Sequence, residues 1–145
     1  MMQNLGPGSL IKVVAGVIEK GGKVLIARRR NEGIFGGLWE FPGGKLEDDE
    51  DPVRGLEREL AEELGVQTRV EDFLCLVSYR NPTLNMSLLA YMVAHVSGEF
   101  KPVDHDEVCW VAPAELDESV FGEPDREIVR RIIARAKSQR RGGKN

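Results

Sequence analysis

The chain has 145 residues, of which 41% are hydrophobic and 30% charged, proportions that are typical of one soluble domain with a sizeable core. Its formal net charge of −4 argues against general binding to a nucleic-acid backbone, which needs a basic surface, but permits a small phosphorylated substrate whose charge metal ions neutralise. No apolar run approaches the ~20 residues of a membrane-spanning helix, and the N-terminal residues lack the pattern of a signal peptide.

Composition along the chain predicts a single domain with loose ends. We expect a flexible leader over residues 1–9, one folded domain over 10–137, and a flexible basic tail over 138–145. Cys75 and Cys109 lie in apolar segments, so we expect buried, reduced thiols. A cytoplasmic location is then the default expectation.

The first elements are predicted to be a β-hairpin and a glycine-bearing loop. Strands are expected over Ile11–Glu19 and Lys23–Arg29, joined by a glycine turn. Arg28, Arg29 and Arg30 leave the apolar pattern together, either as a solvated strand end or as phosphate contacts. After a short extended piece at Trp39–Phe41, Gly43 and Gly44 permit positive φ and close approach of the backbone to a ligand.

A helix is predicted between Asp51 and Gly65. Asp51 is a good N-cap, Pro52 suits the first helical position, and Gly65 suits the residue that ends the helix. At 100° per residue the apolar positions form one face. These positions are Val53, Leu56, Leu60 and Leu64.

The second half of the chain alternates strands and helices. Two long antiparallel strands are expected over Val66–Tyr79 and Asn85–Val96, and a short strand over Val108–Val111. A helical turn within Ala112–Leu116 precedes a helix over Asp125–Lys137. This order predicts an α+β sandwich in which a mixed β-sheet lies between helices.

Three carboxylates share one flank of the first helix. Glu59, Glu62 and Glu63 stand at i, i+3 and i+4, a spacing at which like charges cost a helix a few tenths of a kcal/mol per pair unless a cation offsets it. Oxygen ligands suit Mg²⁺ or Mn²⁺, and neither His95 nor His105 has a partner at metal-ligand spacing. Taken alone, the three glutamates are equally compatible with a solvated acidic face.

The glycines and glutamates together resemble the motif of the Nudix hydrolases. The pattern is a Gly, five residues, Glu, seven residues, then Arg-Glu-aliphatic-x-Glu-Glu-x-Gly-aliphatic. Every defined position is filled here, by Gly44, Glu50, Arg58, Glu59, Leu60, Glu62, Glu63, Gly65 and Val66. The preceding WEFPGGK and the hairpin start look most like the MutT branch, and the resemblance spans roughly Val13 to Ile133.

The resemblance implies a Nudix-type α/β/α sandwich and an enzyme. In the MutT branch, water attacks a nucleoside triphosphate, giving the monophosphate and pyrophosphate. By position, Glu59, Glu62 and Glu63 with the carbonyl of Gly44 would hold Mg²⁺ or Mn²⁺. Arg58 would pair with neighbouring glutamates such as Glu50 and orient them, and Glu59 would also orient or deprotonate the water.

Other positions carry two interpretations each. Glu107, just before a strand, is either a further ligand or base or a solvated loop acid, and Lys45 and Arg29 are candidate phosphate contacts. Phe41 either packs on the base or is buried in the core. Asp125 is either a base contact or a helix N-cap, and an ionised aspartate accepts from the amines of guanine or cytosine without donating to a carbonyl.

Two positions depart from the common Nudix pattern. Asp49 stands where many members have glycine, and Gly55 where many have alanine. Neither change removes a charged group, so we expect activity to survive.

The base remains open. The main expectation is hydrolysis of nucleoside triphosphates, among them oxidised ones such as 8-oxo-dGTP. The alternatives are a (d)CTP-type pyrimidine, a dinucleotide cofactor, a nucleotide sugar, or a Nudix fold that only binds. We expect a small nucleotide as partner, with no nucleic acid and no membrane, and either a monomer or a homodimer.

Overall fold

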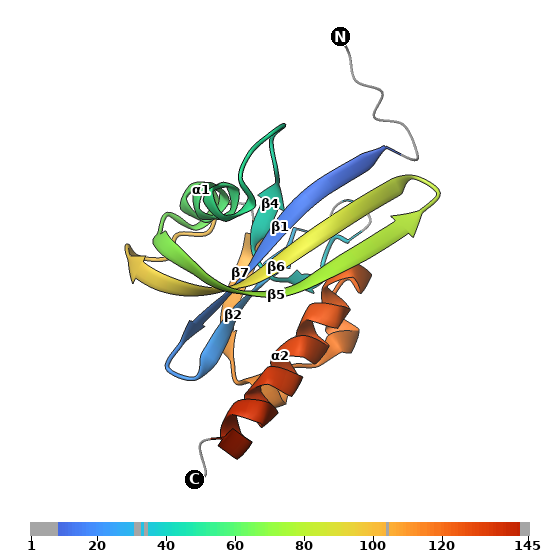
Figure 1. The fold of residues 1–145 in the computed structure, drawn as a ribbon. Helices are drawn as coiled ribbons and strands as arrows, with labels where there is room; N and C mark the ends of the chain where they lie inside the picture. Colours follow the sequence, from blue (N-terminus) through green and yellow to red (C-terminus); the bar gives the residue numbers. More distant parts are fainter. Residues whose placement is uncertain (1–8, 31–32, 34, 104, 143–145) are drawn as a thin grey trace.

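A seven-stranded mixed sheet lies between two helices in the computed structural model (Figure 1), as the sequence predicts. The structure describes residues 9–30, 33, 35–103 and 105–142. In chain order the elements are β1 (Leu10–Lys20), β2 (Lys23–Arg29), β3 (Trp39–Glu40), β4 (Gly43–Lys45), α1 (Pro52–Leu64), β5 (Gln67–Asn81), β6 (Leu84–Ser97), β7 (His105–Val111), the 3-10 helices η1 (Pro113–Glu115) and η2 (Glu118–Val120), and α2 (Glu123–Gly142). Within these ranges no helix is long and apolar enough to cross a membrane.

Strand β1 is the centre of the sheet. The order along the sheet is β3-β2-β1-β6-β5, with β4 paired to the first half of β1 and β7 paired to β2. β1 runs parallel to β6, whereas its pairings with β2 and β4 are antiparallel. β2 therefore lies between β3 and β7, which brings side chains from three strands together at its end.

Each face of the sheet packs against one helix. Val14, Ile18 and Leu25 face α1, where they meet Leu56, Leu60 and Leu64, all fully buried. Each leucine removed from water contributes about 1.5–3 kcal/mol. Alternate strand residues, among them Val17, Val24 and Ile26, face α2 and meet Phe121, Ile128, Val129 and Ile132. The continuous apolar runs of β1 and β2 reflect burial on both faces.

The predicted ends of α1 are confirmed. The carboxylate of Asp51 accepts from the backbone N–H of Arg54 at 3.0 Å, Pro52 is the first helical residue, and Gly65 adopts φ 72° as it ends the helix. The cap fixes where the helix starts, and so fixes which face the three glutamates occupy.

Three elements differ from the prediction. β7 begins at His105 and not at Val108, so Glu107 lies in a strand rather than in a loop. Gly43 and Gly44 form strand β4 rather than a loop, and neither has positive φ; glycine is needed because a Cβ on Gly43 would overlap the carbonyl oxygen of Val14 in β1. Helix α2 starts at Glu123 and runs past Lys137 to Gly142, since nothing before that glycine breaks a helix. Most of the predicted frayed tail is therefore helical, whereas the predicted leader lies almost wholly outside the described residues.

Candidate active site

Arg58 links the glutamates of α1 to the loop before the helix. Its Nε donates to Glu50 Oε2 at 2.7 Å and its Nη2 to Glu50 Oε1 at 2.9 Å, a bidentate pair. Its Nη1 lies 3.1 Å from carboxylate oxygens of both Glu59 and Glu62. The expected pairing of Arg58 with Glu50 is confirmed, and one guanidinium orients three carboxylates.

These contacts give the carboxylates different proton affinities. The hydrogen bonds from Arg58 lower the pKa of Glu50 to about 2, and the same contact raises the pKa of Arg58. Burial raises the pKa of Glu59 in spite of Arg58, and the negative charge of Glu62 adds to the rise. Glu59 is thus a partly buried carboxylate beside another negative charge, and a bound cation would stabilise its ionised form.

Gly44 provides the space in which Glu59 lies. A Cβ at residue 44 would overlap the carboxylate of Glu59, so only glycine lets that carboxylate reach the backbone of β4. Among the residues that the structure describes, no three acidic, histidine or cysteine side chains already converge as a metal site. Arg58 contacts Glu59 and Glu62. The donors are nevertheless carboxylate and carbonyl oxygens, which fit a hard divalent cation.

A cavity of about 270 Å³ runs from these glycines to the start of α2. We call it the site cavity. We call the part formed by β4 and α1, which is lined by Gly43, Gly44, Lys45 and Glu63, its charged end. We call the rest its apolar end, because most of its lining side chains are apolar: Phe35, Trp39, Phe41, Met86, Leu88 and Pro124, with the carboxyl groups of Glu40 and Asp125. Arg29 of β2 also lines the cavity. A lining of this kind suits a ligand that carries both phosphates and a ring.

Asp125 faces the apolar end and is not an N-cap. Its Oδ2 accepts from the backbone N–H of Phe41, which lies outside its own helix, at 2.9 Å. Helix α2 begins before Asp125, at Glu123. The N-cap interpretation is therefore wrong. Burial raises the pKa of Asp125 to about 7, so near neutral pH the carboxyl is present in both proton states and is able to donate as well as accept.

Phe41 belongs to the core. It is 3% exposed, and its ring stacks on that of Phe121 with centroids 5.2 Å apart and planes 17° apart. Of the two interpretations of Phe41, the structure favours burial, although one edge of the residue still lines the site cavity. Its backbone N–H donates to Asp125 and so joins the segment after β3 to α2.

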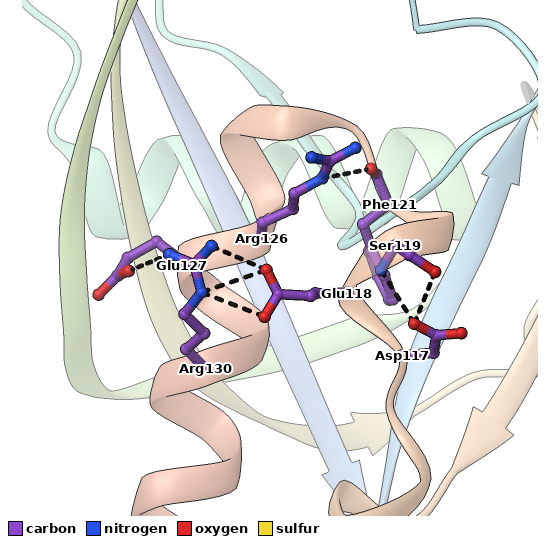
Figure 2. Close-up of polar contacts among 7 residues, drawn as sticks. All are labelled: Asp117, Glu118, Ser119, Phe121, Arg126, Glu127 and Arg130. Carbon is purple, nitrogen blue, oxygen red and sulfur yellow. Dashed lines mark hydrogen bonds and ion pairs between the residues drawn. The ribbon is translucent and has the colours of Figure 1, made fainter.

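Polar contacts join the start of α2 to the segment that precedes it (Figure 2). Arg130 makes three hydrogen bonds to the carboxylate of Glu118, the shortest 2.7 Å, and so ties η2 to α2. The Nε of Arg126 donates to the carbonyl of Phe121, and the carboxylate of Asp117 caps Ser119. This network fixes the segment that carries Gly122 and Asp125 into the cavity.

The three arginines at the end of β2 have separate roles. Arg28 pairs with Glu107 at 3.5 Å, and Arg30 donates to the carbonyl of Val103 at 2.8 Å. Arg29 is the member that lines the site cavity, as Lys45 does. Glu107 is more than half exposed and is not among the cavity residues, so its part as ligand or base stays a prediction.

Glu40 and His105 were not predicted from the sequence to be site residues. The Nε2 of buried His105 lies 2.8 Å from Glu40 Oε2, and Arg29 Nη1 donates to Glu40 Oε1 at 3.1 Å. Burial alone would lower the pKa of His105, but the hydrogen bond to Glu40 and the charges of Glu40 and Glu63 raise it overall. These residues come from β3 and β7, and only the pairing of both strands with β2 brings them together.

The sequence and the structure are both similar to those of known proteins. A family model described as NUDIX domain matches residues 10–132. The chain is 37% identical over 125 residues to a CTP pyrophosphohydrolase of Escherichia coli, covering 86% of this chain and 93% of that protein. It is 40% identical over 121 residues to a putative 8-oxo-dGTP diphosphatase 2 of Mycobacterium tuberculosis, covering 79% and 82%. The solution structure of the E. coli ORF135 protein aligns with a TM-score of 0.78 at 32% identity, covering 87% of this chain and 90% of that one.

Proposed function

Since the chain belongs to the NUDIX domain family, and within it to the hydrolases of the MutT-like branch, we propose that it cleaves nucleoside triphosphates to the monophosphate and pyrophosphate. The observation that carries this proposal is the site cavity, whose charged end adjoins the glutamates of α1 and whose other end is apolar. The two relatives are named for different bases, but both names give a nucleoside triphosphate as substrate. The comparison therefore supports the proposed reaction more strongly than it supports a particular base.

The acidic residues of α1 and Arg58 have different proposed roles in the reaction. Glu59, Glu62 and Glu63, with the carbonyl of Gly44, would hold Mg²⁺ or Mn²⁺, which when bound neutralises phosphate charge and acidifies water. Arg58 keeps Glu59 and Glu62 oriented through its contacts to both. Glu59 is the candidate base for the attacking water, since its carboxylate lies against Gly44.

Phosphate binding needs positive charge at the cavity. Lys45 follows the glycines on β4 and Arg29 ends β2, and both line the cavity. Each is suited to an anionic oxygen that the acidic glutamates would otherwise repel. We assign both to the phosphates.

The carboxyl groups at the apolar end point to a base that carries an exocyclic amine. Glu40 and Asp125 both line this end, and a carboxylate accepts from an amine. Guanine, 8-oxoguanine, cytosine and adenine have such an amine, whereas uracil, thymine and hypoxanthine lack it. The near-neutral pKa of Asp125 also permits donation to a base carbonyl, so an oxidised guanine is not disfavoured. A cytidine triphosphate is the second candidate substrate, favoured by the same two acceptors.

A panel of nucleotides tests reaction and base together. Pyrophosphate release with Mg²⁺ would be measured for dGTP, 8-oxo-dGTP, CTP, UTP and dITP, with Glu62→Gln as the inactive comparison. We expect kcat/KM for dGTP to exceed that for dITP by about tenfold or more, because the two differ only in the exocyclic amine that donates a hydrogen bond to the carboxyl groups. Turnover of no nucleoside triphosphate would overturn the proposed function, and equal rates for dGTP and dITP would overturn the assignment of the amine.

A further inference from the structure

Glu40 is held from two sides at the wall of the site cavity. One oxygen accepts from Arg29 at 3.1 Å, and the other lies 2.8 Å from the Nε2 of His105. A carboxylate has only acceptors, so the ring nitrogen donates in this contact. With both oxygens occupied, the plane of the carboxylate is fixed relative to the cavity that Glu40 lines.

The two partners of Glu40 differ in exposure. The side chain of Arg29 is 48% exposed and lines the cavity, whereas that of His105 is 3% exposed. The guanidinium of Arg29 is therefore open to a phosphate in the cavity, whose charge attracts it away from Glu40. His105 is buried and is not among the residues that line the cavity, so a bound phosphate does not reach its ring. It therefore keeps its contact when substrate is bound.

We propose that His105 is a positioning residue for substrate recognition, which holds the Glu40 carboxylate toward the nucleotide base once Arg29 turns to the phosphates. The inference rests on the proposed hydrolysis of nucleoside triphosphates. His105 itself touches no substrate: it acts through Glu40, from the first residue of β7 across the end of β2. Its contribution is largest in the complex, where Arg29 no longer restrains Glu40.

A double-mutant cycle tests the role. His105→Leu removes the donor, Glu40→Ala removes the acceptor, and His105→Gln keeps a donor at similar reach. We expect His105→Leu to raise KM for dGTP about tenfold with kcat within about twofold, as expected when a hydrogen bond to a charged group is lost. His105→Gln should restore most of the affinity. In the Glu40→Ala background, where no carboxylate is left to position, His105→Leu should change KM by less than about twofold.

The chain contains a matched control in its other histidine. His95 lies in β6, bonds to the carbonyl of Gly98 at 2.7 Å and is not a cavity residue, so His95→Gln should leave KM and kcat at wild-type values. Thermal melting of each variant separates loss of folded protein from loss of affinity. A His105→Leu enzyme with lowered melting temperature but unchanged KM would reduce His105 to a structural residue and overturn the proposal. Equal effects in both backgrounds would overturn it as well.

A binding measurement separates this inference from the proposed function. The ¹⁵N signals of the two histidine rings would be followed by NMR as dGMP is added, in wild type and in Glu40→Gln. We expect Glu40→Gln to shift the His105 signals and not those of His95, and the His105 hydrogen bond to persist with dGMP bound. Loss of that bond on binding overturns the role of His105. Absence of turnover in the nucleotide panel overturns the proposed function and is read independently.

Discussion

The guanidinium of Arg58 forms a bidentate pair with the carboxylate of Glu50, at 2.7 Å and 2.9 Å, and its remaining nitrogen reaches Glu59 and Glu62. We predict that Arg58→Lys keeps the charge but loses this geometry, because an ammonium cannot form the planar fork. Activity should fall about 10- to 100-fold in kcat, as catalytic carboxylates move out of place. Pyrophosphate release measures the effect. Arg54→Lys, exposed on the same helix, should retain activity, and an equal loss there would refute the geometric explanation.

The two glycines of β4 should respond differently to the same substitution. A Cβ at Gly44 meets only the end of the Glu59 side chain, which can move, so Gly44→Ala should fold and lose about 100-fold or more in kcat. A Cβ at Gly43 meets the backbone of Val14, which cannot move without opening the sheet. Gly43→Ala should cost about 3 kcal/mol of stability. Circular dichroism melts and turnover, measured on both variants, test this contrast; two folded, active proteins would contradict it.

Asp125 should make stability depend on pH in the opposite direction to an ion-paired acid. Its pKa in the fold, about 7, exceeds the ordinary value of 3.8, so between these values the folded state holds a proton that the unfolded state releases. Stability due to this group is therefore present at low pH and is lost as pH rises toward 7. Asp125→Asn mimics the protonated form and still accepts from Phe41. Relative to wild type it should gain about 1 kcal/mol or more between pH 4 and 7.

Denaturant titrations at a series of pH values measure this slope. Asp48→Asn, at an exposed position before α1, provides the comparison and should leave the slope as in wild type. If Asp125→Asn and wild type lose stability in parallel across the range, the raised pKa of Asp125 is wrong.

Asp49 is the one described residue other than glycine with positive φ, at 60°. This is the position at which many Nudix sequences have glycine, and the backbone gives the reason. Asp49→Gly should raise the free energy of unfolding by about 0.5 kcal/mol, since relief of the left-handed strain exceeds the entropy lost by glycine on folding. Asp48→Gly, where φ is negative, should lower it. Chemical denaturation of both variants decides, and a loss of stability in both would count against strain at Asp49.

The other departure from the Nudix pattern also has a local cause. A Cβ on Gly55 would overlap the side chain of Leu46 and press on the carboxyl group of Glu50. Glycine therefore lets this chain pack Leu46 against α1 without displacing the carboxylate that Arg58 holds. Alanine at this position requires a different packing of residue 46.

The sequence predicted best the parts that are contiguous in the chain. Helix α1 and its Asp51 cap follow from spacing within one short stretch, because i, i+3 and i+4 neighbours are fixed by helix geometry. The pairing of Arg58 with Glu50, eight residues apart, was expected from the resemblance to the Nudix motif. The recognition end was less predictable. Glu40 and His105 meet only because β2 pairs with both β3 and β7, and pairing of distant strands leaves no periodic trace in the sequence.

Asp125 illustrates a different limit. Its place before an apolar helix favoured the N-cap interpretation, which is a statement about local chain direction. The structure starts α2 earlier, and the carboxylate of Asp125 accepts from the backbone N–H of Phe41, which follows β3 and is far away in the sequence. Its unusual pKa arises from burial, a tertiary property that no local pattern contains.

The parallel pairing of β1 with β6 has a consequence for how the chain is made. Leu10 pairs with Asn85 and Glu19 with Ala94, so the central strand gains this neighbour only after most of the polypeptide has left the ribosome. Until then Val14, Val17 and Ile18, which end fully buried, have an open edge on one side and apolar side chains on both faces. The sheet of a nascent chain of this kind therefore closes late, at the entropic cost of a long loop.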